Sequence, residues 1–155
     1  MLFRRLKLLV ALSPSELRLL LSAMFLLPLT GLSLRMFGLR RTHDWMRRLT
    51  KSDVGIVPDG YAGDEARSVA RMVAIAGRRM PYRVTCLREA LVLWWLLSRR
   101  GIRAQLILGV GRPDNVFAAH AWVECQGIVL NDDDSVRENF VPVDWNLADR
   151  AGRLA

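Results

Sequence analysis

The stretch AAHAWVECQGIVLNDDD, from Ala118 to Asp134, alternates apolar and polar side chains and then ends in three aspartates. Successive side chains of an extended strand point to opposite faces. His120, Trp122 and Glu124 are therefore predicted to share one face of a strand. The Gln-Gly pair that follows Cys125 is typical of a turn that returns the chain alongside this strand. The stretch predicts an antiparallel hairpin that brings one histidine close to a cluster of acids.

The partner of His120 depends on the length of the turn in this hairpin. A three-residue loop, Cys125–Gly127, places His120 opposite Asp132, whereas a two-residue Gln-Gly turn places it opposite Asp133. Directly opposed side chains have Cβ atoms about 5 Å apart, close enough for a carboxylate to hydrogen-bond an imidazole. We prefer Asp132, because glycine suits the last, left-handed position of the longer loop, and we expect Asp134 to be a solvated loop residue.

The segment CLREALVLWWLLSRRG, which begins at Cys86, is the second one with chemical interest. Its apolar centre, closing arginines and final glycine predict a buried helix with Cys86 in its first turn. The free N–H groups and the dipole at a helix start favour a thiolate and can bind an oxyanion. With His120 as base and an aspartate to orient it, the groups that thiol catalysis needs are present. The alternative is that Cys86 is a small buried apolar residue and that His120 is structural.

Helix boundary signals predict the remaining elements. Ser13, Pro14 and Glu16 form the pattern of a capped helix start, and we expect this helix to extend to about Leu27. Further along the chain we expect a basic helix at 40–49, a linker at 50–63, a helix at 64–80 and a buried strand at 102–111. The chain is thus predicted to be an α+β protein.

Composition limits the class of protein. At 155 residues, with 52% apolar and 25% charged residues, the chain is predicted to be globular, with an apolar helical segment at 1–63 and a core at 64–155. The net charge is +8, but no aromatic-rich basic ribbon or RNA-binding motif indicates a nucleic-acid partner. Cys86 and Cys125 lack the spacing of a metal site or disulfide framework. We expect two free thiols, no metal, and a reducing cytoplasm.

The apolar run from Leu19 to Leu34 has 16 residues without a charge. It is shorter than a membrane-spanning helix and contains Pro28 and Gly31. We expect it to pack against the rest of the protein or a partner. A position on a membrane surface, aided by the basic residues at 4, 5 and 7, is the alternative.

The segments CLREALVLWWLLSRRGIRAQLILGV and AHAWVE, with an aspartate twelve residues after the histidine, resemble the transglutaminase-like cysteine peptidases of lasso-peptide biosynthesis. The resemblance is greatest to the stand-alone leader peptidases of split systems, and it covers about residues 64–155. It implies a transglutaminase-like, papain-like core whose nucleophile lies at a helix N-terminus packed on a small antiparallel sheet. By motif matching it assigns the nucleophile to Cys86, the base to His120 and the acid to Asp132.

The same resemblance implies a bacterial, cytoplasmic peptidase that removes the leader from a ribosomally made precursor through a thioester, with no cofactor. Fused members carry an N-terminal leader-recognition domain, and residues 1–63 are too apolar and helical for that winged-helix module. The implied partners are the precursor peptide, a separate leader-binding protein and an ATP-dependent cyclase. Two alternatives are an acyltransferase with the same three residues, and a noncatalytic scaffold that docks partners or a membrane through its N-terminus.

Overall fold

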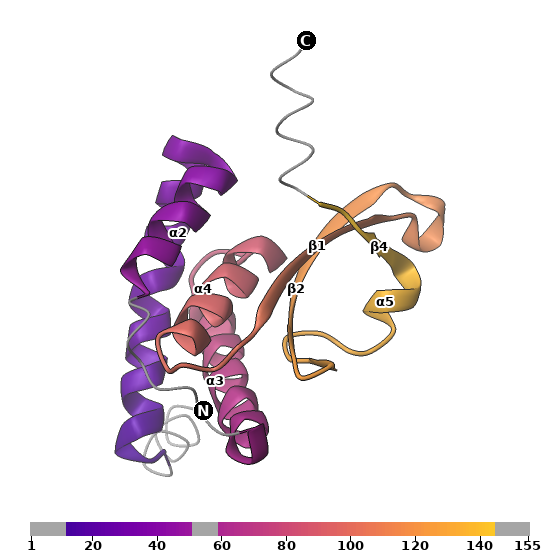
Figure 1. Cartoon of the computed structure of the whole chain (residues 1–155). Helices are drawn as coiled ribbons and strands as arrows, with labels where there is room; N and C mark the ends of the chain where they lie inside the picture. Colours follow the sequence, from indigo (N-terminus) through magenta and orange to yellow (C-terminus); the bar gives the residue numbers. More distant parts are fainter. Residues whose placement is uncertain (1–11, 51–58, 145–155) are drawn as a thin grey trace, which may run out of the picture.

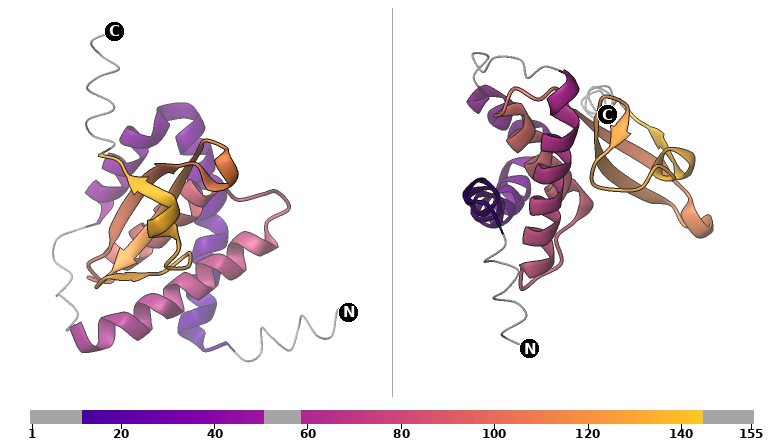
Figure 2. Two further views of the ribbon diagram at one scale, coloured as in Figure 1. Left: turned by 90° about the vertical axis from the view of Figure 1, so that its right-hand side faces the viewer. Right: turned by 90° about the horizontal axis from the view of Figure 1, so that it is seen from below.

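Three helices precede a small sheet in the computed structural model, which describes residues 12–50 and 59–144. The helices lie on one side and the sheet on the other, with α4 against the sheet (Figures 1 and 2). This arrangement confirms the predicted α+β class. The elements, in chain order, are α2 (Pro14–Leu49), α3 (Asp59–Arg79), α4 (Cys86–Ser98), β1 (Gln105–Gly111), η1 (Pro113–Asn115), β2 (Ala118–Cys125), β3 (Ile128–Val129), α5 (Val136–Asn139) and β4 (Phe140–Pro142).

Helix α2 begins as predicted and ends much later than predicted. The Ser13 hydroxyl accepts from the Glu16 N–H at 3.3 Å, and the Glu16 carboxylate accepts from the Ser13 N–H at 2.9 Å, which confirms the capping box. The predicted end at Leu27 is wrong, because the helix continues through Pro28. Its buried residues pack on α3 and α4, so tertiary packing outweighs the local cost of the proline.

A break at Gly38 divides α2 into two helical parts. The backbone of Gly38 has φ 74° and ψ 176°, outside the helical region and readily adopted by glycine. The part that follows contains the basic helix predicted at 40–49, which is confirmed. This part of α2 is bound to α4 by a hydrogen bond, in which the Trp95 Nε1–H donates to the carbonyl oxygen of Met46 at 3.0 Å.

One face of α2 exposes large apolar side chains to solvent. They recur every three or four residues and are 38% to 70% exposed, and we call them the apolar stripe of α2: Leu17, Leu21, Phe25, Leu29, Leu32 and Met36. By length and composition α2 could cross a membrane, but a third of its most apolar window is buried inside the protein. The basic residues at 4, 5 and 7 lie outside the described residues.

Helix α3 begins at Asp59, whereas the sequence predicted a start at residue 64. Its end at Arg79 agrees with the prediction to within one residue. Ala62 and Ala66 are buried in the main core, and their burial offsets the poor helix propensity of the glycine between them. The linker predicted at 50–63 is therefore shorter, and its residues 51–58 lie outside the described part of the chain.

The four strands form one antiparallel sheet in the order β3-β2-β1-β4. The two faces of β2 differ as predicted. Ala121, Val123 and Cys125 belong to the main core with α2, α3 and α4. Trp122 is fully buried on the opposite face, in a second cluster with Val129, Val136, Ile107 and Phe140. The sheet is thus covered on one face by α4 and on the other by α5 and the side chain of Phe140.

The start of α3 can be tested at Gly63. A Cβ atom added to Gly63 would meet no heavy atom within 4 Å, so alanine fits there without strain. We expect Gly63→Ala to raise the free energy of unfolding by about 0.5–1 kcal/mol, measured by urea unfolding, because alanine favours a helix over glycine. Gly127→Ala is the matched control: its site is equally open, but φ is 76°, so alanine should destabilise the fold. Unchanged stability of Gly63→Ala would place the start of the helix after residue 63.

Candidate active site

Cys86 is the first residue of α4 and is half-buried. Thr85 caps the helix, and its hydroxyl accepts from the Arg88 N–H at a long 3.5 Å. The helix interior is buried, from Ala90 to Leu97 with the exception of Trp95. This burial confirms that Cys86 lies in the first turn of a buried helix. Its thiol is therefore near the free N–H groups and the positive end of the helix dipole.

Cys86 and His120 line the same pocket, whose volume is about 250 Å³. The other lining residues are almost all apolar: Leu87, Leu108, Gly109, Val110, Ala119, Ala121 and Val143. Among the described residues no hydrogen bond connects the Cys86 thiol with the His120 ring. Hydrogen bonds between catalytic groups are often long in the absence of substrate and shorten when it binds. The structure thus brings the two residues to one pocket, where no hydrogen bond joins them.

The imidazole of His120 is held by a carboxylate and two aromatic rings. Its Nε2 lies 2.5 Å from Oδ2 of Asp132. The ring stacks on Phe140 at 5.1 Å between centroids and on Trp122 at 6.3 Å. Gly109 pairs with His120 across β1 and β2, and a Cβ atom there would lie 2.7 Å from the Trp122 ring. Because Asp132 occupies Nε2, Nδ1 is the ring nitrogen that remains for a proton from another group.

The turn that leads to Asp132 has two residues, so the three-residue loop that we predicted is wrong. Gln126 and Gly127 both have positive φ, 51° and 76°, as in the tight turns that match the twist of a hairpin. Cys125 pairs directly with Ile128 across this turn. Continued pairing in this register would place Asp133, and not Asp132, opposite His120.

The pairing of His120 with Asp132 arises because β3 ends after only two residues. Beyond Val129, the Leu130 N–H still donates to the Val123 carbonyl oxygen at 3.0 Å. The Asn131 side chain then replaces the backbone, and its Oδ1 accepts from the Val123 N–H at 2.8 Å. The chain leaves the sheet at this point, and Asp132 reaches the histidine from a loop.

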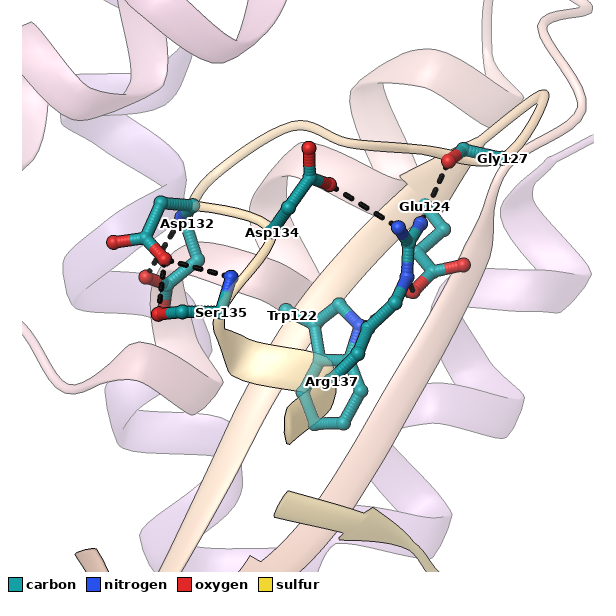
Figure 3. Close-up of polar contacts among 8 residues, drawn as sticks. Trp122, Glu124, Gly127, Asp132, Asp134, Ser135 and Arg137 are labelled. Atoms are coloured by element: carbon teal, nitrogen blue, oxygen red, sulfur yellow. Dashed lines mark hydrogen bonds and ion pairs between the residues drawn. The ribbon is translucent and has the colours of Figure 1, made fainter. Parts of the chain in front are cut away.

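The two aspartates after Asp132 have other partners. Asp133 accepts from the Ser135 N–H at 2.9 Å and also from the Ser135 hydroxyl. These hydrogen bonds hold the pKa of Asp133 below its usual value. Asp134 is 81% exposed and lies 3.1 Å from Nη1 of Arg137 (Figure 3), in agreement with the solvated loop position predicted for it. The structure thus separates Asp132, at the histidine, from its two neighbours.

Arg137 anchors the acidic loop to the sheet, and the sequence analysis missed it. Figure 3 shows its guanidinium between Asp134, the Gly127 carbonyl oxygen and Glu124. Its Nε donates to Glu124 at 2.9 Å and its Nη2 donates to Gly127 at 2.6 Å. The Trp122 indole N–H also donates to Glu124 at 2.9 Å. The hydrogen bond from Arg137 lowers the pKa of Glu124. The position of Glu124 on the His120 face was the available signal, but nothing in the sequence pairs it with residue 137.

Glu89, one turn into α4, is a second group that the sequence analysis missed. Burial raises the pKa of its carboxyl group, Arg78 opposes this shift, and Asp132 adds to it. Glu89 therefore lies within electrostatic range of the aspartate that holds the histidine. In the described part of the chain, no group of three or more histidine, cysteine, aspartate or glutamate residues could hold a metal ion.

Comparison with known proteins gives one family match. A family model described as the transglutaminase-like superfamily matches residues 26–144. The matched range includes Cys86, His120 and Asp132, and it begins within α2. No curated protein and no solved structure gives a significant match to the chain. The predicted division into 1–63 and 64–155 stays a prediction.

The two thiols should differ in reactivity. Cys86 is half-buried at a helix start, whereas Cys125 is 3% exposed within β2. We expect iodoacetamide to label Cys86 at least about tenfold faster than Cys125 in the folded protein at neutral pH, as measured by peptide mass spectrometry. Labelling in urea is the control and should make the two rates similar. Faster labelling of Cys125 in the folded protein would contradict the assignment of Cys86 as the reactive thiol.

Proposed function

The chain belongs to the transglutaminase-like superfamily, and we propose that it is a cysteine peptidase with Cys86 as nucleophile, His120 as base and Asp132 as the residue that orients the base. The observation that carries the proposal is the contact between His120 and Asp132 beside a pocket that Cys86 also lines. These are the nucleophile, base and orienting group that thiol catalysis requires.

The mechanism follows from which nitrogen of His120 is already bound. Asp132 holds Nε2, so Nδ1 takes the proton from the Cys86 thiol as the thiolate attacks the scissile carbonyl carbon. Backbone N–H groups at the start of α4 stabilise the oxyanion of the tetrahedral intermediate. The imidazolium then protonates the departing amine, and a thioester remains on Cys86. Water, deprotonated by His120, hydrolyses this thioester and regenerates the thiol.

The proposed substrate is the precursor of a lasso peptide, cut between leader and core. This part rests on the motif resemblance over CLREALVLWWLLSRRGIRAQLILGV and AHAWVE, and on the spacing between His120 and Asp132. The freed core amine is what an ATP-dependent cyclase would join to a side-chain carboxylate. Neither Cys86 nor Cys125 forms a disulfide in the described part of the chain, which is consistent with a reducing cytoplasm as the place of reaction.

Capture of the thioester by an amine would make the protein an acyltransferase. The superfamily match favours this alternative equally, because both reactions share the nucleophile and the acyl-enzyme. Incubation of the protein with a candidate lasso precursor peptide, with and without a leader-binding protein, followed by mass spectrometry, separates the two. Hydrolysis gives free leader and core, whereas transfer gives a leader joined to the added amine. An intact precursor with the wild-type chain would contradict both reactions and favour the noncatalytic scaffold.

We also propose that a small leader-binding protein delivers the precursor. The apolar stripe of α2 is a candidate docking surface, since exposed apolar patches of this kind mark sites of association. The basic face at Arg40, Arg41, Arg47 and Arg48, which follows on the same helix, is a second candidate. Delivery would raise the effective concentration of the scissile bond at Cys86 without new contacts to it. A membrane surface is the competing occupant of the same stripe.

If Asp132 orients His120, Asp→Asn substitutions at three neighbouring aspartates should lower the turnover of the precursor to different extents. Asp132→Asn should lower turnover of the precursor by about two to four orders of magnitude, because an amide at this position no longer holds the base in its productive state. Asp133→Asn should cost less than about tenfold, since Asp133 binds Ser135 and not His120. Asp134→Asn is the matched control and should change turnover less than about twofold, because it removes only an exposed ion pair.

A larger loss in Asp133→Asn than in Asp132→Asn would show that β3 extends in solution and that the register of its ladder selects the acid. Circular dichroism of each variant should match the wild type, which excludes unfolding as the cause of any loss.

The delivery proposal predicts a dependence on the partner. At about 1 μM full-length precursor, addition of the leader-binding protein should raise the cleavage rate about tenfold or more. Phe25→Ser, in the apolar stripe, should reduce this ratio if the stripe is the docking surface. Phe117→Ser is the matched control, because Phe25 and Phe117 are similarly exposed, 70% and 66%. Equal rates with and without the partner would contradict delivery. A loss of the ratio in both serine variants would contradict docking on the stripe.

A further inference from the structure

A groove much larger than the pocket of Cys86 is lined in part by Asp132, the residue that binds His120. It has a volume of about 920 Å³ and is bordered by α3, the segment between α3 and α4, and residues 129–132. Figure 2 shows α3 running along the edge of the sheet at which β3 lies. Ligand sites commonly have volumes of about 300–1,000 Å³. Four arginines line this cavity, which we call the arginine groove: Arg67, Arg71, Arg78 and Arg83.

Small residues on α3 leave the groove open. Ala70, Ala74 and Gly77 are spaced by four and three residues, so they share one face of the helix. All three line the groove, and none carries a side chain long enough to fill it. Tyr82, Val84 and Leu130 add apolar surface to the same cavity. A chain with an extended backbone can therefore contact both apolar surface and guanidinium groups there.

The positive charge of the groove is only partly neutralised by the protein. Arg71 pairs with Glu16, and Arg67 lies 4.0 Å from Asp64 in an exposed pair. Arg83 is exposed and makes no ion pair or hydrogen bond with the residues that the structure describes. Its guanidinium has five N–H donors whose planar arrangement matches a carboxylate.

Glu89 is half-buried and lines the groove together with Arg78, which acts on it electrostatically. Burial raises the pKa of Glu89, and Arg78 opposes this shift. A Cβ atom added to Gly77 would lie 3.7 Å from the Glu89 carboxylate, which places this acid beneath the small face of α3. Among the residues that line the groove, four arginines outnumber two carboxylates, Glu89 and Asp132, and His120 already binds Asp132, so the lining carries an excess of positive charge.

The groove and the proposed site share a wall. Asp132 lines the arginine groove, and His120 lines the pocket of Cys86. The two side chains meet at 2.5 Å. A peptide bound in the groove would therefore run up to the residue that holds the catalytic base.

We infer that the arginine groove binds an acidic segment of the peptide substrate, with Arg78 and Arg83 as the main contacts to its carboxylates. This inference rests on the proposed peptidase function. Exposed charge pairs contribute modestly, so the groove should set a severalfold preference for acidic peptides, which weakens as salt increases.

The first test measures binding without catalysis. Fluorescein-labelled hexaglutamate is titrated with the Cys86→Ala protein and followed by fluorescence anisotropy, with labelled hexaglutamine as the uncharged probe. Hexaglutamate should bind, hexaglutamine should not, and binding should weaken between about 50 mM and about 500 mM NaCl. Arg78→Gln with Arg83→Gln should weaken it by about fivefold. The matched control is Arg35→Gln with Arg103→Gln, which removes equal charge at two exposed positions outside the groove and should change binding less than about twofold.

Equal weakening in the two double variants would overturn the inference, because net charge alone would then explain binding. Absence of hexaglutamate binding would overturn it as well. Cleavage of the precursor by the wild-type chain tests the peptidase proposal separately. If the precursor is cleaved, the groove variant should raise KM by about fivefold for an acidic precursor and leave kcat within about twofold. If hexaglutamate binds as expected and no precursor is cleaved, the peptidase proposal fails and the groove stands as an acidic-peptide site.

Discussion

The burial of α4 on both sides is the constraint that positions the rest of the site. Seven of its 13 residues are buried, against α2 and α3 on one side and strands β1 and β2 on the other. Each fully buried leucine contributes roughly 1.5–3 kcal/mol, so rotation or sliding of the helix would expose several kcal/mol of apolar surface. Cys86, the first residue of this helix, is therefore held in one position relative to β2. The thiol is fixed by packing, and the histidine and its acid are fixed by the sheet and by the loop that leaves it.

Local patterns were sufficient to predict which residues the structure brings together at the candidate site. The alternation in AHAWVE predicts the face on which His120 lies, and the apolar run after Cys86 predicts a buried helix with the cysteine in its first turn. Both signals depend on periodicity over a few residues, which tertiary contacts rarely reverse. The choice of Asp132 over Asp133 agrees with the structure, but the reason given for it was wrong. The turn has two residues, and the early end of β3 selects the acid.

Features that depend on contacts between distant segments were not predictable. Helix α2 passes through Pro28 because buried residues on either side of it pack on α3 and α4. The hydrogen bonds from Arg137 to Glu124 and to the Gly127 carbonyl oxygen join residues that no sequence pattern connects. The arginine groove likewise needs three separate segments, of which only the small face of α3 has a sequence signature. Sequence periodicity indicates which face of a helix or strand is apolar, but it does not indicate the element on which that face packs.

Asn131 has a consequence for how this site can change over evolutionary time. Its side chain takes the Val123 N–H that a longer β3 would have bound, so the path of the chain to Asp132 is set at residue 131 and not at the turn. Insertions at Gln126 and Gly127 can therefore lengthen the hairpin tip without displacing the acid, provided that the main chain still enters β3 in the same register. Deletion of one residue between Val129 and Asp132 has no such tolerance, because it moves the carboxylate away from His120. Length variation is thus permitted at the exposed tip and excluded at the two residues, Leu130 and Asn131, that lead to the acid.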